Sequence, residues 1–304
     1  MVPSPREAAG LRGRLERDVP MARHTSWRVG GRAERVYRPA DLDDLAAFLR
    51  TLPPDEPLHW VGLGSNLLVR DGGLRGTVIL LHGGLDRIER LDARTVRAEA
   101  GAACAKLARA TARMGLAGLE FMAGIPGTVG GALAMNAGAF GGETWARVRQ
   151  VWTIDRAGRV RARAPADYTV GYRSVRGPAG EWFVAAALAL APGDGRGLER
   201  IRALLARRAA TQPMGRPSCG SVFRNPPGDH AGRLIEAAGL KGVRRGGAMV
   251  SERHANFIVN TGGATAADIE ALIRHVQETV ERVHGVRLEP EVRIVGEPEE
   301  GREA

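Results

Sequence analysis

Apolar residues recur at helical spacing in several separate stretches of the chain. Asp41 suits a helix N-cap, and three leucines on one face predict a helix that runs from there to about Leu52. Thr265 and Asp268 form a capping box at the start of another helix with a clear apolar stripe. Helical spacing also predicts helices over 103–114, 198–210 and 230–238. The helix over 198–210 is expected to bury Leu198, Ile201, Leu204 and Leu205.

Shorter runs of apolar residues between turn residues predict strands, and they outnumber the helices. They cover 33–38, 58–61, 78–81, 95–99, 148–154, 182–189 and 255–260. Asp155–Gly158 suits a hairpin turn after one of them. A last strand is expected over 286–295, where apolar and charged residues alternate. The stretch 124–142 consists mostly of small residues and is expected to wrap its backbone around something else.

The length of 304 residues allows two or three domains. The net charge is +10, but the cations are scattered, and only 5% of residues are aromatic. A dedicated nucleic-acid protein would concentrate its cations and interleave aromatic residues. No apolar run reaches the ~20 residues of a membrane helix, and the first residues lack a secretion signal. We therefore expect a cytoplasmic monomer that binds small molecules rather than nucleic acid or membrane.

Two glycine-rich segments, about sixty residues apart, could hold a phosphate-bearing ligand through backbone N–H groups. The first follows the strand at 58–61 and contains Gly62, Gly64, Ser65, Asn66 and Leu67. The second contains Gly124, Ile125, Pro126, Gly127, Thr128 and Gly130, followed by Asn136 and Gly138. Together they would suit a dinucleotide. A plain strand-exit turn and a glycine-packed loop are the alternative interpretations.

Ser221 lies in a turn of small residues, directly after Gly220 and shortly before Arg224 and Asn225. A glycine before the serine lets another molecule approach the hydroxyl closely. Nothing beside Ser221 would act as the general base that a nucleophilic serine needs, so its hydroxyl is expected to donate a proton. A turn with a capping serine is the alternative. The two cysteines, Cys104 and Cys219, are too few for a zinc site and are expected to be reduced core residues.

These segments together resemble the UDP-N-acetylenolpyruvoylglucosamine reductase family of flavoenzymes. The resemblance extends from about residue 24 to 296, in the order of the family. The matching stretches are 24–31, 62–69, 124–132, 172–174, 220–226, 254–260 and 288–296. The stretch from Tyr172 to Trp182 is short, which resembles the shorter form of the family without an extra tyrosine-bearing loop.

The resemblance implies an α+β fold with a two-part FAD-binding region of the p-cresol methylhydroxylase type, followed by a smaller α/β substrate-binding domain. It implies an FAD-binding region over 21–195 and a substrate-binding domain over 196–304. Residues 1–20 are polar and contain Pro3 and Pro5, so they are expected to form a loosely held N-terminal arm. The FAD-binding region would divide into subdomains at about 21–72 and 73–195. The two glycine-rich segments would hold FAD noncovalently, and Arg293 would lie near the flavin.

The resemblance also implies the reaction. Hydride would pass from NADPH to FAD and then to the enolpyruvyl ether of a UDP-sugar, with Ser221 as the general acid and Arg173 and Glu291 as its catalytic companions. A dry cleft would keep the proton of Glu291 available by raising its pKa. Substrate contacts are expected from Tyr172, Arg173, Asn225, His254 and Asn256.

Two other interpretations of the sequence remain open. One is a different FAD oxidoreductase on the same fold, which would share the glycine-rich segments but lack the combination of Ser221 and Glu291. The other is a basic nucleotide-binding or nucleic-acid-binding protein, which the positive net charge would favour.

Overall fold

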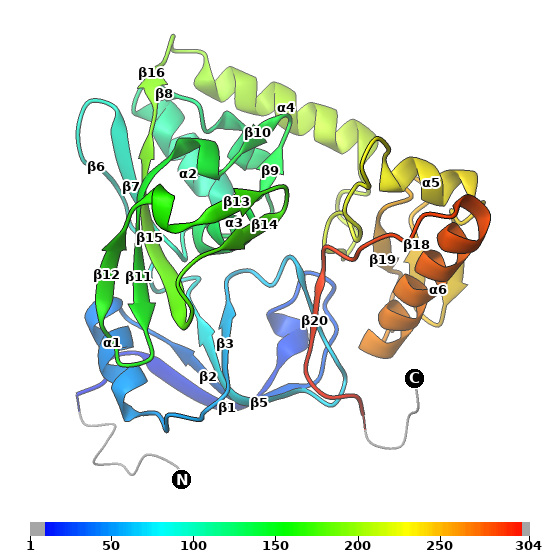
Figure 1. Cartoon of the computed structure of the whole chain (residues 1–304), viewed down its shortest axis with the longest axis horizontal. Coiled ribbons are helices and arrows are strands. Elements are labelled where there is room, and N and C mark those ends of the chain that lie inside the picture. The colour runs from blue at the N-terminus through cyan, green and yellow to red at the C-terminus, as the bar shows by residue number, and fades with distance from the viewer. Residues whose placement is uncertain (1–9, 300–304) are drawn as a thin grey trace. The chain divides into compact units, whose positions relative to one another are not determined.

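The computed structural model describes residues 10–299 and divides the chain into two compact units (Figure 1). The first unit contains the chain up to Arg17, Arg35–Leu63 and Gly76–Ala206. The second unit contains Asp18–Glu34, Gly64–Arg75 and the chain from Arg207 onward. The first glycine-rich segment is therefore divided between the two units, since the boundary falls directly after Leu63.

The main sheet of the first unit has the strand order β12-β11-β15-β7-β6, and every neighbouring pair is antiparallel. Its strands are β6 (Ile88–Arg90), β7 (Thr95–Glu99), β11 (Val148–Asp155), β12 (Val160–Arg163) and β15 (Glu181–Ala189). Helices α2 (Cys104–Arg113) and α3 (Val129–Met135) lie on one side of the sheet (Figure 1) and share a buried apolar cluster with it. The turn predicted at Asp155–Gly158 is confirmed, because it joins β11 to β12.

A second sheet has the order β1-β2-β5-β3, and helix α1 (Leu42–Thr51) adds its leucines to a cluster with Ile79 of β5. Its strands are β1 (Arg14–Pro20), β2 (Arg32–Arg38), β3 (Leu58–Val61) and β5 (Leu74–Leu80). The cap is confirmed, since the Asp41 side chain accepts a hydrogen bond from the Asp44 N–H at 2.9 Å. The expected loose arm over 1–20 is too long, because residues 14–20 form β1; residues 1–9 lie outside the described part.

Two features of the first unit differ from the sequence expectations. The small-residue stretch 124–142 contains a helix that was not predicted, α3, with the Thr128 hydroxyl accepting from the Gly131 N–H. Alanine and leucine in this stretch supply helix propensity that its glycines had obscured. Helix α4 (Gly197–Thr211) forms as predicted, but Leu198 stays 40% exposed, and Ile201 is the buried member of its stripe.

The second unit packs α5 (Ala231–Ala237) and α6 (Ala266–His284) with the sheet β17-β18-β19 (Figure 1). The strands of this sheet are β17 (Arg244–Arg245), β18 (Ala248–Val250) and β19 (Ile258–Asn260). The capping box of α6 is confirmed, with the Thr265 hydroxyl accepting from the Asp268 N–H at 3.0 Å. Trp27 and Leu68 are fully buried in the same core, so two distant segments complete it.

The last strand is shorter than predicted. Only β20 (Arg293–Val295) is regular, and it pairs in parallel with β4 (Leu67–Val69). Pro290 has no N–H to donate and interrupts the ladder before it. The predicted apolar face is nevertheless correct, because Leu288 and Val292 are buried in the core of the second unit. The remaining short strands are β8 (Leu116–Ala117), β9 (Gly138–Ala139), β10 (Gly142–Glu143), β13 (Thr169–Gly171), β14 (Ser174–Arg176) and β16 (Ala191–Pro192).

Candidate active site

The Ser221 turn has the open approach that its sequence predicted. Gly220 has a φ of +81°, which favours glycine, and a Cβ built there would meet nothing within 4 Å. Ser221 itself is half-buried, whereas the next two residues, Val222 and Phe223, are buried. Ser221 therefore lies at the edge of the core of the second unit, directly after a glycine that borders open space.

The backbone pairs the Ser221 turn with the segment that carries Glu291. The Glu291 N–H donates to the carbonyl of Val222 at 2.7 Å, and the Arg224 N–H donates to the carbonyl of Glu289 at 2.9 Å. Ser221 and Glu291 are thus held next to each other by residues adjacent to them in sequence. Burial, and after it the negative charge of Glu291, raises the pKa of the Cys219 thiol, which keeps this neighbour neutral.

The second half of the first glycine-rich segment also contacts the Glu291 strand. The Asn66 amide donates to the carbonyl of Glu291 at 3.0 Å, and the Arg293 N–H donates to the carbonyl of Asn66 at 3.1 Å. Leu67 pairs with Arg293 where β4 meets β20. The segment predicted to bind the cofactor therefore lies beside the backbone of Glu291, the predicted catalytic residue.

Gly62 and Gly64 lie so close to other residues that no side chain fits at either position. Gly64 has a φ of +59°, and a Cβ there would collide with the carbonyl oxygen of His24. A Cβ on Gly62 would collide with the hydroxyl of Thr128. The contact of Gly62 with Thr128 brings the two glycine-rich segments together in the first unit, although they are about sixty residues apart in sequence.

The second glycine-rich segment lies along the start of α2. The Cys104 N–H donates to the carbonyl of Gly127 at 2.9 Å, and the Gly130 N–H donates to the carbonyl of Ala100 at 2.8 Å. Of the other predicted cofactor residues here, Gly124 packs against the ring of Phe140, Ile125 is buried and Pro126 is exposed. On the first segment, Ser65 is half-buried.

Arg173 is held against the end of the second glycine-rich segment. Its guanidinium donates to the carbonyls of Asn136 at 3.2 Å and Gly138 at 2.9 Å, and its φ of +52° is unusual for a residue with a side chain. Tyr172 is exposed, and its ring centroid lies 5.2 Å from the guanidinium carbon of Arg173. The predicted catalytic arginine therefore depends on the backbone of two predicted cofactor residues.

Asn136 does not have the exposed side chain expected of a cofactor ligand. It is 1% exposed, and its amide group donates to Glu143 and Gly171 and accepts from the Trp145 N–H. The sequence missed these partners because two of the three are backbone groups, which no residue type reveals. Asn136 therefore organises the loop that holds Arg173.

The predicted substrate residues of the second unit differ in exposure. Asn225 is exposed, and its side-chain oxygen accepts from the Ala231 N–H at the start of α5. His254 accepts from the Asn256 N–H, and burial, with a smaller effect of Lys241, lowers the pKa of its imidazole. Asn256 is 4% exposed and bonded to the backbone of Phe223, so its burial does not support the expected direct contact with substrate.

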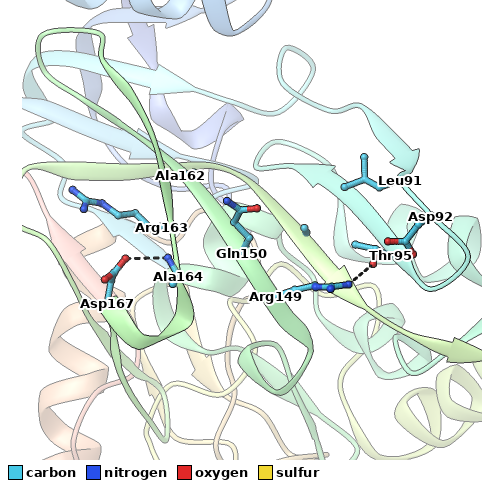
Figure 2. A pocket seen from close by; sticks show the side chains of 10 residues that line it. Leu91, Asp92, Thr95, Arg149, Gln150, Ala162, Arg163, Ala164 and Asp167 are labelled. Atoms are coloured by element: carbon cyan, nitrogen blue, oxygen red, sulfur yellow. Dashed lines mark hydrogen bonds between the residues drawn. The ribbon is translucent and has the colours of Figure 1, made fainter.

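A shallow groove on the main sheet of the first unit is a separate hollow (Figure 2). Within it, Arg149 donates to the Thr95 hydroxyl at 3.2 Å, and the Ala164 N–H donates to the Asp167 carboxylate at 2.9 Å. None of the predicted site residues lines this groove. Arg149, Arg163 and Asp167 already have partners in the protein, so we do not assign the active site to this groove.

Between residues 10 and 299, no group of three or more His, Cys, Asp or Glu side chains is arranged to hold a metal ion. Both cysteines are buried free thiols. No helix in the described part of the chain combines the length and apolar character that a membrane crossing requires.

The residues fit an FAD cofactor in one specific respect. Gly62 lies so close to Thr128 that no side chain fits at position 62, so within the first unit the two segments meet in a surface made largely of backbone atoms. Such a backbone surface suits a pyrophosphate. The chain matches the family model described as "FAD binding domain" over residues 33–162, which includes both segments. The chain is an FAD-dependent oxidoreductase with an α+β fold, as predicted.

Residues 212–295 match the model described as "UDP-N-acetylenolpyruvoylglucosamine reductase, C-terminal domain". The reductase of this name from Alkalilimnicola ehrlichii is 70% identical over 94% of this chain and 96% of its own length. The reductase from Methylococcus capsulatus is 65% identical over 96% of this chain and 96% of its own length. The chain therefore belongs to the UDP-N-acetylenolpyruvoylglucosamine reductase family, which confirms the resemblance.

A solved structure agrees with this assignment. The crystal structure of UDP-N-acetylenolpyruvylglucosamine reductase from Thermus caldophilus is similar with a TM-score of 0.80 and 36% sequence identity. The similarity covers 93% of this chain and 99% of that structure. The predicted fold class is thus confirmed over nearly the whole length.

Proposed function

We propose that the protein reduces the enolpyruvyl ether of UDP-N-acetylglucosamine enolpyruvate to UDP-N-acetylmuramate, at the expense of NADPH, in the synthesis of peptidoglycan precursors. The observation that carries the proposal is the backbone pairing of Val222 with Glu291, which supports the assignment of Ser221 and Glu291 to one site because their backbones lie close together in one unit. We further propose that it works as a cytoplasmic monomer, with FAD held mainly by 21–195 and substrate by 196–304.

FAD, when bound, supplies the hydride chemistry that links NADPH to the methylene carbon of the enolpyruvyl group. The backbone of Gly62–Asn66 and Gly124–Gly130 would hold its pyrophosphate, with the hydroxyls of Ser65 and Thr128 as further donors. The remaining proposed contacts are Leu67, Gly138 and Arg293. The contact of Gly62 with Thr128 supports this assignment, because it makes one backbone surface from the two segments.

Arg173 and Glu291 would stabilise the negative charge that develops on the substrate. Addition of hydride to the methylene carbon leaves charge at the neighbouring carbon and in the carboxylate, as an enolate. A guanidinium has the fork that binds a carboxylate through two hydrogen bonds. Donors that are already in place where charge develops lower the barrier most, and Arg173 is held in place by the carbonyls of Asn136 and Gly138.

Ser221 would complete the reaction by donating its proton to the carbon that carries the enolate charge. Its half-buried position beside open space supports this role, because substrate can reach the hydroxyl while water is partly excluded. Tyr172, Asn225 and His254 would contact the remainder of the substrate. The neutral imidazole favoured by the lowered pKa of His254 can hydrogen-bond a sugar nucleotide without adding charge.

The proposal is tested by measuring NADPH consumption by the purified protein with and without the enolpyruvyl sugar nucleotide. We expect a yellow preparation with flavin absorbance and oxidation of NADPH that requires this substrate. A yellow protein that oxidises NADPH only with small alcohols or carbonyl compounds would indicate another flavoenzyme on the same fold. A colourless protein that binds nucleic acid in a salt-dependent way would contradict the proposal altogether.

A further inference from the structure

The side chain of Asn256 makes two hydrogen bonds to a single residue, Phe223. Its Oδ1 accepts from the Phe223 N–H at 2.9 Å, and its Nδ2 donates to the Phe223 carbonyl at 2.8 Å. In addition, the Asn256 carbonyl accepts from the Val222 N–H at 2.9 Å. Asn256 therefore makes three hydrogen bonds to the two residues that directly follow Ser221.

The same two residues are held from their other side by the Glu291 segment. The Val222 carbonyl accepts from the Glu291 N–H at 2.7 Å, and Phe223 forms an isolated bridge with Pro290. Val222 and Phe223 are 1% and 2% exposed, so water cannot replace these bonds easily. Val222 and Phe223 are thus bonded to Asn256 on one side and to the Glu291 segment on the other. The position of the Ser221 turn relative to Glu291 therefore depends on Asn256.

We propose that Asn256 is a positioning residue that sets the place of the Ser221 hydroxyl and does not itself bind substrate. This inference rests on the proposed function, since that function gives Ser221 its role. An amide can accept from an N–H and donate to a carbonyl of the same residue at once, whereas a carboxylate can only accept. A displacement of about 1 Å at a reacting group can lower a rate by up to ~10²-fold.

Asn256→Asp tests the proposal because it replaces only the Nδ2 group, which donates to the Phe223 carbonyl, by an oxygen. The bond to that carbonyl then depends on pH. The introduced carboxylate keeps the acceptor for the Phe223 N–H but directs a second oxygen at the Phe223 carbonyl. Burial raises the pKa of such a carboxyl, and its protonated form can donate to the carbonyl again. The variant should therefore be defective at high pH and recover as the pH falls.

Asn260→Asp is the matched control, because it makes the same change four residues further along the chain, at the end of β19. The Asn260 amide donates to the carbonyl of Trp27 and accepts from the N–H groups of Gly262 and Ala264. In the described part of the chain, its side chain makes no hydrogen bond to the Ser221 turn. Any general effect of a new carboxyl in this part of the second unit should appear in both variants.

We expect kcat of Asn256→Asp at about pH 8 to fall by ~10²-fold relative to the unmodified protein, with KM for the enolpyruvyl sugar nucleotide nearly unchanged. The deficit should shrink toward about pH 6, while Asn260→Asp shows no such recovery. A raised KM with unchanged kcat would overturn the proposal, because it would make Asn256 a substrate ligand. An unchanged kcat at all pH values would also overturn it.

Hydrogen exchange provides a readout that does not depend on catalysis. The Val222 and Phe223 amides should lose protection in Asn256→Asp at high pH and regain it at low pH, and unchanged protection would contradict the proposed support. If the unmodified protein shows no substrate-dependent NADPH oxidation, the proposed function fails, while exchange still decides whether Asn256 holds the turn. If Asn256→Asp does not fold at high pH, Asn256→Ser replaces it and should lose kcat without recovery in acid.

Discussion

Individual side chains at the candidate site are held mainly by backbone groups of other segments. Arg173 donates to two carbonyls of the second glycine-rich segment, and Asn66 donates to the carbonyl of Glu291. Backbone partners are less mobile than side chains, so they hold a catalytic group close to one geometry. Preorganisation of this kind is what stabilisation of a developing charge requires.

Arg173→Lys should lower kcat by about 10- to 100-fold, because a lysine keeps the charge but cannot donate to two carbonyls and a carboxylate in the fork geometry of arginine. Arg176→Lys is the control, since Arg176 is an exposed residue on the adjacent strand β14 and should retain normal turnover. Steady-state kinetics with NADPH and the enolpyruvyl sugar nucleotide would measure both variants. Equal kcat values for the two would remove Arg173 from the proposed catalytic group.

At the scale of elements, the two glycine-rich segments act together because one glycine permits their contact. Gly62 follows directly on β3, and Thr128 precedes α3. The residues that meet, Gly62 and Thr128, lie just outside these two elements. Their contact therefore joins the end of a strand to the start of a helix within the first unit.

Gly62→Ala should weaken FAD binding and lower the melting temperature, because its new methyl group would collide with the Thr128 side chain. Gly131→Ala provides the matched control. A Cβ at Gly131 would meet only the Thr128 hydroxyl, at an ordinary 3.7 Å, and alanine favours the helix in which it lies. Flavin release on titration and thermal unfolding would compare the two variants, and normal FAD affinity in Gly62→Ala would contradict the account.

Much of the element pattern was predictable, because helices and strands depend on local periodicity. The Asp41 cap, the hairpin at Asp155–Gly158 and the capping box of Thr265 all follow from short-range chemistry. The partners of Asn256 and two of the three partners of Asn136 were not predictable, since they are backbone groups brought near by the tertiary fold. The last strand was predicted too long because the prediction followed the alternation of apolar and charged residues. It did not allow for Pro290, which has no N–H to donate to a strand ladder.

At the scale of the whole molecule, the compact units do not follow the order of the sequence. The second unit includes Asp18–Glu34 and Gly64–Arg75 in addition to the C-terminal part of the chain. The Asp71 carboxylate accepts from the N–H groups of Ala266 and Ala267, which caps α6 from 195 residues away. The C-terminal unit is therefore built from three segments of the chain.

A fragment of residues 196–304 should not fold cooperatively on its own. It would lack Trp27 and Leu68, which are fully buried in the core, and β4, the partner of β20. Loss of large buried side chains typically costs several kcal/mol each, which is comparable with the whole stability of a domain. Circular dichroism and urea titration of the fragment would measure this, and a sharp unfolding transition like that of the full chain would contradict it.

The central claim is that Ser221 delivers the proton that completes reduction of the enolpyruvyl group. Rapid mixing of Ser221→Ala with NADPH, and then with the enolpyruvyl sugar nucleotide, separates this step from reduction of the flavin. We predict that the flavin is reduced at a normal rate and that formation of UDP-N-acetylmuramate slows by about 10²- to 10⁴-fold. Product formation at the rate of the unmodified protein would contradict the account.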